Sequence, residues 1–306
     1  MQFRARRHRG APLLAAIVAC AIMMIVAAFP TPSQAAHGHG VKNSARASVR
    51  KHRVRRSPPG GVWSRNAIVL DSATGEVLFE KNSDLSVPIA SLTKLMTTMV
   101  FLEQHPDLSR EVEVTREELD GAGHTQLRNG EQVSLENLLH MALMCSDNVA
   151  TRVLARESGL SREDFLARMN RKAIELGMTH TRLVEFTGLD ERNVSTASDV
   201  ARLLHAAAGV DLIREISTTR SWAFASARRR HEVRNTNRLL YSHYEILGGK
   251  TGFINEAGYC LATWIRTQGR DLIAVVLGAP TNATRFADTV RLVQRATSAS
   301  IAQTGP

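Results

Sequence analysis

The sequence predicts an α+β fold, with an antiparallel sheet assembled from both ends of the folded region. Strand-like segments lie near the start of that region and again near its end. Amphipathic helical segments occupy the middle, and a further amphipathic segment, 282–303, closes the chain. Strands and helices that are grouped in this way, and do not alternate, are typical of α+β proteins.

The strand-like segments are short, apolar and bounded by turn residues. AIVLD (67–71) and EVLFEK (76–81) flank the turn residues 72–75, so they predict a hairpin. Four further segments of this kind follow residue 220: SWAFAS (221–226), YEILGGKTGF (244–253), GYCLATWIR (258–266) and DLIAVVLGA (271–279).

The middle of the chain predicts five helices. The first begins at Ser91, and its apolar residues recur at helical spacing: Leu92, Leu95, Met96, Met99 and Val100. Residues 104–133 look irregular. The other four helices are expected over 134–144, 147–158, 161–177 and 195–209. Ser134 and Ser161 are predicted N-caps, and Gly177 is a predicted helix stop.

The start of the chain predicts export. Residues 1–35 combine an arginine-rich beginning, an apolar run and the small residues of TPSQAA, which is typical of a signal peptide. The apolar run is nearly long enough to span a bilayer, so an uncleaved anchor is an alternative. IVAC (17–20) loosely matches a lipoprotein signal. In each case we expect an exported protein of the periplasm or cell envelope.

The net charge of +10 belongs to the head of the chain. Residues 1–70 hold 12 basic and no acidic residues, whereas the remainder holds 27 basic and 29 acidic residues. Residues 36–61 therefore predict a disordered basic linker. It either attaches to an anionic envelope surface or is a solvated spacer, and an exported chain is not expected to bind nucleic acid. Residues 62–306 predict one folded domain.

Two cysteines, Cys145 and Cys260, remain once the signal peptide is removed. An exported chain permits a disulfide, but pairing requires a geometry that the sequence does not give. We expect two buried free thiols, with a disulfide as the alternative.

Ser91 and Lys94 combine a nucleophile with a base on one helix face. Residues at i and i+3 are neighbours, so the amine can reach the hydroxyl. Serine needs a base to become a nucleophile. Lysine is a base only when it is neutral, which burial and a nearby positive charge favour. The spacing alone is weak, because Ser48 and Lys51 of the linker share it.

A second motif, SDN (146–148), lies between two predicted helices. The Ser146 hydroxyl could relay a proton to a leaving amine, and the Asn148 amide could hold a substrate peptide. Taken alone, Ser146 also fits the N-cap of the helix that follows.

A third motif, KTG (250–252), occurs once and lies in a predicted strand. Lys250 would supply the positive charge near Lys94 and could pair with a substrate carboxylate. Thr251 offers a hydroxyl to the same carboxylate, and Gly252 lets a substrate backbone approach the strand. The alternative for this motif is a solvated turn.

The three motifs in this order resemble those of penicillin-binding proteins and class A β-lactamases. Beyond the motifs, residues 67–287 are similar to the low-molecular-mass penicillin-binding proteins, which are D-alanyl-D-alanine carboxypeptidases and endopeptidases. The likeness lies in IASLTKLMT, ALMCSDNVA, GMTHTRLVEFTGLDERNVSTASDVARL, STTR, RNTNRLL and GGKTGFINEAGYCLA. Its details are most similar to the endopeptidase branch.

This resemblance implies a catalytic domain over 62–306, with a five-stranded antiparallel sheet flanked by helices and a helical subdomain. It also implies a serine acyl-enzyme that forms with peptidoglycan stem peptides and with β-lactam antibiotics, without a metal or cofactor. The residue roles carry over as follows: Ser91 as nucleophile, Lys94 as proton acceptor, Ser146 as second hydroxyl, Asn148, Lys250, Thr251 and Gly252 as substrate-binding residues, and the backbone N–H groups of Ser91 and Phe253 as oxyanion hole.

The sequence leaves four possible functions open. The branch favours a DD-endopeptidase that cleaves D-alanine cross-links over a carboxypeptidase that trims pentapeptides. A class A β-lactamase needs a carboxylate for its deacylating water, and in VEFTGLDERN (184–193) Glu185, Leu189 and Asn193 do not have the required spacing. The last alternative is a non-catalytic peptidoglycan binder, although no motif residue is missing.

Overall fold

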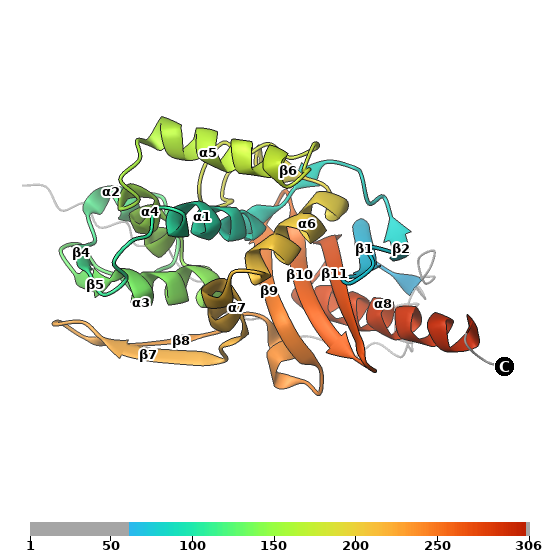
Figure 1. The fold of residues 1–306 in the computed structure, drawn as a ribbon. Helices are drawn as coiled ribbons and strands as arrows, with labels where there is room; N and C mark the ends of the chain where they lie inside the picture. Colours follow the sequence, from blue (N-terminus) through green and yellow to red (C-terminus); the bar gives the residue numbers. More distant parts are fainter. Residues whose placement is uncertain (1–60, 304–306) are drawn as a thin grey trace, which may run out of the picture. The chain divides into compact units, whose positions relative to one another are not determined.

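The computed structural model describes residues 61–303, with side chains to residue 298 (Figure 1). The predicted signal peptide, and all of the predicted linker except Gly61, lie outside the described residues. Among residues 61–303, no helix is both long enough and apolar enough to cross a membrane.

A five-stranded antiparallel sheet forms the centre of the fold, with the strand order β2–β1–β11–β10–β9. The chain start provides β1 (Asn66–Asp71) and β2 (Val77–Lys81). The chain end provides β9 (Glu245–Ile254), β10 (Gly258–Thr267) and β11 (Arg270–Ala279). The predicted α+β class and the contribution of both ends to one sheet are therefore confirmed. The motif strand β9 lies at one edge of this sheet.

The sheet is buried on both faces. In β11, Ile273 and Val275 pack into the core shared with the helical block, whereas Leu272 and Ala274 pack with α8 (Asn282–Gln303). Successive residues of a strand point to opposite faces, so the continuous apolar sequence of β11 serves both cores. Figure 1 shows α8 along one face, with α6 (Ala197–Ala208) on the other.

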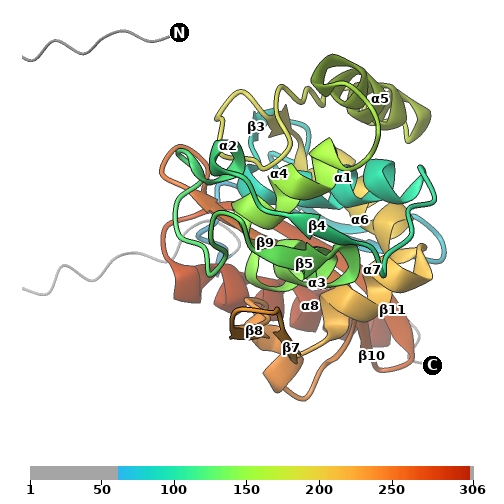
Figure 2. The same ribbon diagram turned by 90° about the vertical axis from the view of Figure 1, so that its left-hand side faces the viewer.

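The helical block lies between β2 and β9 in the sequence (Figure 2). Its main helices are α1 (Thr93–Leu102), α3 (Leu135–His140), α4 (Asn148–Arg156), α5 (Arg162–Glu175), α6 and α7 (Asp211–Thr218). The predicted N-caps are present, because the hydroxyls of Ser134 and Ser161 accept from the backbone N–H groups three residues later. Gly177 has a φ of +69°, which suits the predicted helix end.

Some elements differ from the predictions. The SWAFAS segment does not join the sheet, because β7 (Ser221–Ala225) pairs with β8 (Arg230–Arg234) as a separate hairpin. The strand β8 was not predicted from the sequence, because its charged residues obscure the alternation of apolar and polar residues. Residues 104–133, predicted to be irregular, hold the short elements β4 (Glu111–Glu113) and α2 (Arg116–Leu119).

Two short strands, β3 (Val87–Pro88) and β6 (Val194–Ser195), pair beside the first motif. They tie the chain before Ser91 to the end of the 184–193 loop, and the Ile89 N–H donates to the Asn193 carbonyl at 3.1 Å. Both described cysteines are free, as expected, but only Cys260 is buried, whereas Cys145 is half-buried.

Candidate active site

Ser91 lies on a short 3₁₀ turn, Ala90–Leu92, that precedes α1. The sequence predicted a helix that begins at Ser91, but the α-helix begins at Thr93. Ala90 has a φ of +49°, a conformation that is rare for residues with a Cβ and is concentrated at functional sites. The surrounding structure must hold this turn, and Gly188 packs directly against it: a Cβ there would lie 1.9 Å from the Ala90 carbonyl oxygen.

Lys94 is fully buried on the first turn of α1. Its Nζ lies 3.0 Å from the Ser91 Oγ, 2.7 Å from the Asn148 Oδ1 and 2.6 Å from the Thr187 carbonyl oxygen. Burial lowers the pKa of Lys94 to about 7, although the nearby carboxylate of Glu185 raises it. A substantial share of Lys94 is therefore neutral at pH 7.

The neighbours of Lys94 decide where its lone pair points. A neutral amine has two N–H groups and one lone pair. The oxygens of Thr187 and Asn148 can only accept hydrogen bonds, so they take both N–H groups. The lone pair is left for the Ser91 hydroxyl, at a distance that suits proton abstraction. The geometry thus prepares Ser91 to lose its proton to Lys94.

Ser146 belongs to the same centre and does not cap a helix. Asp147 is the N-cap of α4, since its carboxylate accepts from the Ala150 N–H at 3.0 Å. Ser146 has a φ of +65°, and its Oγ lies 2.8 Å from the Nζ of Lys250. The alternative of an N-cap at Ser146 is therefore wrong.

Lys250 is also buried, with 1% of its surface exposed. Burial, and after it the positive charge of Lys94, holds the pKa of Lys250 well below its usual range. From the sequence we expected burial and the charge of Lys250 together to keep Lys94 neutral. In the structure burial is the main cause of the low Lys94 pKa, and the electrostatic influence of one lysine on the other acts on Lys250.

The strand side of the site is the edge strand β9. Its Thr251 Oγ1 lies 2.6 Å from the Oγ1 of Thr236, which follows the β7–β8 hairpin. A Cβ on Gly252 would lie 3.0 Å from the Ile89 carbonyl oxygen and 3.1 Å from the Ser91 nitrogen. The absence of a side chain at residue 252 thus lets β9 lie close to the Ala90–Leu92 turn that carries Ser91. The sequence had predicted that this glycine lets a substrate backbone approach the strand.

Phe253 follows the motif at the edge of the sheet. Its side chain is 46% exposed and stacks on Tyr259 at a centroid distance of 4.3 Å. The Phe253 and Ser91 N–H groups, the predicted oxyanion donors, lie on segments that pack against each other. The structure therefore brings together all three predicted motifs.

Sequence reasoning missed the loop 184–193 as part of the site. The Glu185 carboxylate accepts from the Thr187 N–H and hydroxyl, both at 2.7 Å, and from the Gly188 N–H. The fully buried Asn193 side chain donates to Glu185 at 2.9 Å. These bonds fix the carbonyl that Lys94 binds. The available signal was the polar segment VEFTGLDERN itself. In the sequence analysis this segment served only as an argument against a β-lactamase.

Arg285 of α8 is the second residue that was missed. It is 6% exposed, and its Nη1 donates to the carbonyl oxygens of Gly252 and Cys260 at 2.9 and 3.2 Å. Burial lowers its pKa to about 10. Arg285 thus holds β9 beside β10 just behind the third motif. A basic residue on the apolar face of the closing helix was the available signal.

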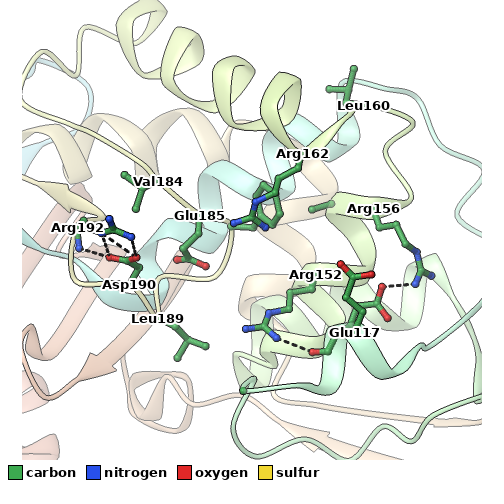
Figure 3. A pocket seen from close by; sticks show the side chains of 14 residues that line it. Glu117, Arg152, Arg156, Leu160, Arg162, Val184, Glu185, Leu189, Asp190 and Arg192 are labelled. Atoms are coloured by element: carbon green, nitrogen blue, oxygen red, sulfur yellow. Dashed lines mark hydrogen bonds and ion pairs between the residues drawn. The ribbon is translucent and has the colours of Figure 1, made fainter.

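A cavity of about 720 Å³ lies beside this centre, between α2, α4, the start of α5 and the 184–193 loop. Glu185, whose loop holds Lys94, is one of its lining residues, and Gly121 is another. Figure 3 shows several charged side chains that point into it. Among the described residues, no group of three or more His, Cys, Asp or Glu side chains is placed to hold a metal ion.

Comparison with known proteins identifies a family. The family profile described as D-alanyl-D-alanine carboxypeptidase matches residues 52–281. A D-alanyl-D-alanine endopeptidase of Pseudomonas aeruginosa is 41% identical over 75% of this chain and 76% of its own length, and one of Escherichia coli is 38% identical over 76% of each. The crystal structure of the Streptomyces K15 DD-transpeptidase superimposes with a TM-score of 0.74 and 25% identity, over 78% of this chain and 98% of its own.

Proposed function

Because this chain belongs to the D-alanyl-D-alanine carboxypeptidase family, we propose that it hydrolyses D-alanyl bonds of peptidoglycan stem peptides through an acyl-enzyme on Ser91. The observation that carries the proposal is the contact of a buried, readily neutral Lys94 with the Ser91 hydroxyl. The Thr187 and Asn148 oxygens bound to this amine can only accept hydrogen bonds, so in its neutral form the lone pair of Lys94 faces the Ser91 hydroxyl and can act as a base.

The reaction follows from the positions of these groups. Lys94 takes the Ser91 proton while the Oγ attacks the carbonyl carbon of the D-alanyl bond. The backbone N–H groups of Ser91 and Phe253 bind the resulting oxyanion. Ser146, whose hydroxyl contacts Lys250, passes its proton to the leaving amine as the C–N bond breaks. The proton that Lys94 took from Ser91 restores the Ser146 hydroxyl, so Lys94 is neutral again. Water then hydrolyses the Ser91 ester and regenerates the hydroxyl.

We infer that the leaving amine comes from a neighbouring stem peptide, so that the enzyme is a DD-endopeptidase. The support is the likeness to two proteins named D-alanyl-D-alanine endopeptidases. The second candidate is carboxypeptidase activity, in which the leaving amine is a terminal D-alanine. Pentapeptide monomers and cross-linked dimers, incubated side by side with the enzyme, distinguish the two by which substrate disappears.

The structure weakens the β-lactamase alternative further. A deacylating carboxylate needs a free oxygen for water, but each Glu185 oxygen already accepts two hydrogen bonds from the loop. We therefore expect penicillin to stay bound to Ser91 as a long-lived acyl-enzyme. Rapid turnover of a chromogenic cephalosporin would contradict this expectation.

Labelled penicillin tests the nucleophile. We expect the wild type to be labelled and Ser91→Ala to remain unlabelled. Ser109→Ala, which changes an exposed serine on another segment, is the matched control and should label like the wild type. Labelling of Ser91→Ala at the wild-type level would show that Ser91 is not the nucleophile. Labelling of the wild type without any cleavage of muropeptides would favour a non-catalytic binder.

We further propose that the chain is exported to the periplasm or cell envelope, with 62–306 as its catalytic domain. The support is the signal-like composition of residues 1–35 and the basic composition of 36–61. Fractionation of cells that express the full chain tests export, and a cytoplasmic pool alone would contradict it. Sedimentation with isolated envelopes, before and after replacement of the linker arginines by glutamine, tests attachment of the linker to an anionic surface.

A further inference from the structure

The cavity beside the active site is lined by arginines and by carboxylates, and two of its arginines form no ion pair with a described carboxylate. Four arginines line it: Arg152, Arg156, Arg162 and Arg192 (Figure 3). Two of them have carboxylate partners, since Arg156 pairs with Glu118 and Arg192 pairs with Asp190. The other two arginines, Arg152 and Arg162, have no carboxylate partner among the described residues.

Arg152 donates to the backbone carbonyls of Glu118 and Asp120 and to no carboxylate among the described residues. Arg162 lies over the Phe186 ring, 4.9 Å from its centroid, and makes no ion pair with a described residue. Glu185 is saturated by hydrogen bonds from its own loop, and the exposed Glu117 has no ion pair among the described residues. Arg152 and Arg162 thus have no described carboxylate within ion-pair distance.

The cavity begins one helical turn from the substrate-binding amide. Asn148 and Arg152 are at i and i+4 of α4, so they share one face of the helix at a Cβ separation of about 5–6 Å. Asn148 contacts Lys94 through its Oδ1, while its Nδ2 donates to the Ala122 carbonyl at 2.8 Å. The neighbouring Gly121 lines the cavity. A peptide held by Asn148 therefore has the cavity next to it.

We propose that this cavity binds a side-chain or α-carboxylate of the acyl-donor stem peptide, on a residue before the D-alanine that reacts with Ser91, with Arg162 and Arg152 as its ligands. The proposal rests on the DD-peptidase function. Peptidoglycan stems carry such free carboxylates, and a guanidinium binds a carboxylate through two parallel hydrogen bonds. The contact of the Arg162 guanidinium with the Phe186 ring restricts this side chain, which lowers the entropy lost on binding.

The test compares two substrates with one variant. The substrates are the D-alanyl peptide that the wild type cleaves, with the carboxylates before the reacting D-alanine either free or amidated. We expect Arg162→Gln to lower kcat/KM for the free acid by about tenfold, through KM, because one charged hydrogen-bond partner is lost. The amidated peptide should be cleaved equally by wild type and variant. Arg171→Gln, on the same helix but outside the cavity lining, is the matched control and should change neither rate.

Equal losses on both peptides, or no loss on either, would overturn the proposal. Competition of each peptide against labelled penicillin measures the same preference as binding, independently of turnover. Normal penicillin labelling of Ser91 together with no preference for the free acid would reject the carboxylate site and leave the peptidase function intact. Failure of wild-type Ser91 to label would reject the proposed function itself, and the carboxylate site with it.

Discussion

The two sides of the active site are built in different ways. The helical side consists of α1, α4 and the 184–193 loop, and its key groups are buried polar side chains that saturate one another. The strand side is β9, where small residues and backbone lie close to the Ala90–Leu92 turn that carries Ser91. Proton transfer requires a tuned pKa, which a dry and hydrogen-bonded environment supplies. Substrate binding at a sheet edge requires accessible backbone, which small residues supply.

The largest effect should come from the lysine on the helical side. Lys94→Met retains the length and burial of the side chain but removes the base. We expect the second-order rate constant for acylation by penicillin to fall on the order of 10⁴-fold, as for loss of a catalytic base in a serine enzyme. Lys250→Met should cost less, about 10²-fold, because Lys250 contacts Ser146 and not Ser91, and its proposed role is to bind the substrate.

Acylation kinetics measured beside thermal unfolding separate these losses from misfolding. If Lys250→Met lost more activity than Lys94→Met, with both variants folded, the division between a proton-transfer side and a binding side would be wrong.

A second contrast uses one glycine from each side. Gly188→Ala places a Cβ 1.9 Å from the Ala90 carbonyl at a φ of +82°, so the backbone must move. We expect acylation to fall about 100-fold, since small displacements of a nucleophile are costly, and the free energy of unfolding to fall by about 3 kcal/mol. Gly252→Ala meets its nearest atoms at 3.0–3.1 Å, and a smaller loss of about tenfold is expected.

The control for this contrast is Gly123→Ala. Gly123 has a similar φ of +81° but no atom within 4 Å of its would-be Cβ. Strain alone should cost about 1 kcal/mol and leave acylation unchanged. A Gly188→Ala variant that behaved like Gly123→Ala would show that the loop does not hold the turn that carries Ser91.

A third and smaller effect concerns Glu185. Its charge raises the pKa of Lys94, against the effect of burial. Glu185→Gln removes that charge, so the Lys94 pKa should fall and the acid limb of the acylation profile should move to lower pH. The plateau rate should also fall, by about tenfold, because the amide nitrogen faces donors of the loop. A lower plateau with an unmoved acid limb would mean that Glu185 acts on loop geometry alone.

The sequence was sufficient for the parts of the site that depend on local spacing. Ser91 and Lys94 are one helical turn apart, and an apolar helix predicts the burial that lowers the lysine pKa. The strand segments of the sheet were also readable, because each is a short apolar run between turn residues. The SWAFAS segment shows the limit, since the same alternation describes a strand of the sheet and a strand of a separate hairpin.

The parts that could not be predicted depend on contacts between distant residues. Thr187 binds Lys94 across 93 residues of sequence through a backbone carbonyl, which has no side-chain signature. Arg285 of the last helix likewise binds a backbone carbonyl, that of Gly252, 33 residues earlier in the sequence. Ser146 was open to an N-cap interpretation, and only the left-handed backbone at that residue, with Asp147 as the cap, resolves it.

The most direct test of the central claim is the pH dependence of acylation of the wild type by penicillin. The reactive form has a neutral Lys94, so the rate constant should fall below the Lys94 pKa and reach a plateau above it. We predict one acid limb with an apparent pKa of about 7, in accord with the buried lysine. A rate that continued to rise through pH 10, as expected for an ordinary solvated lysine, would contradict the account of Lys94 as a base kept neutral by burial.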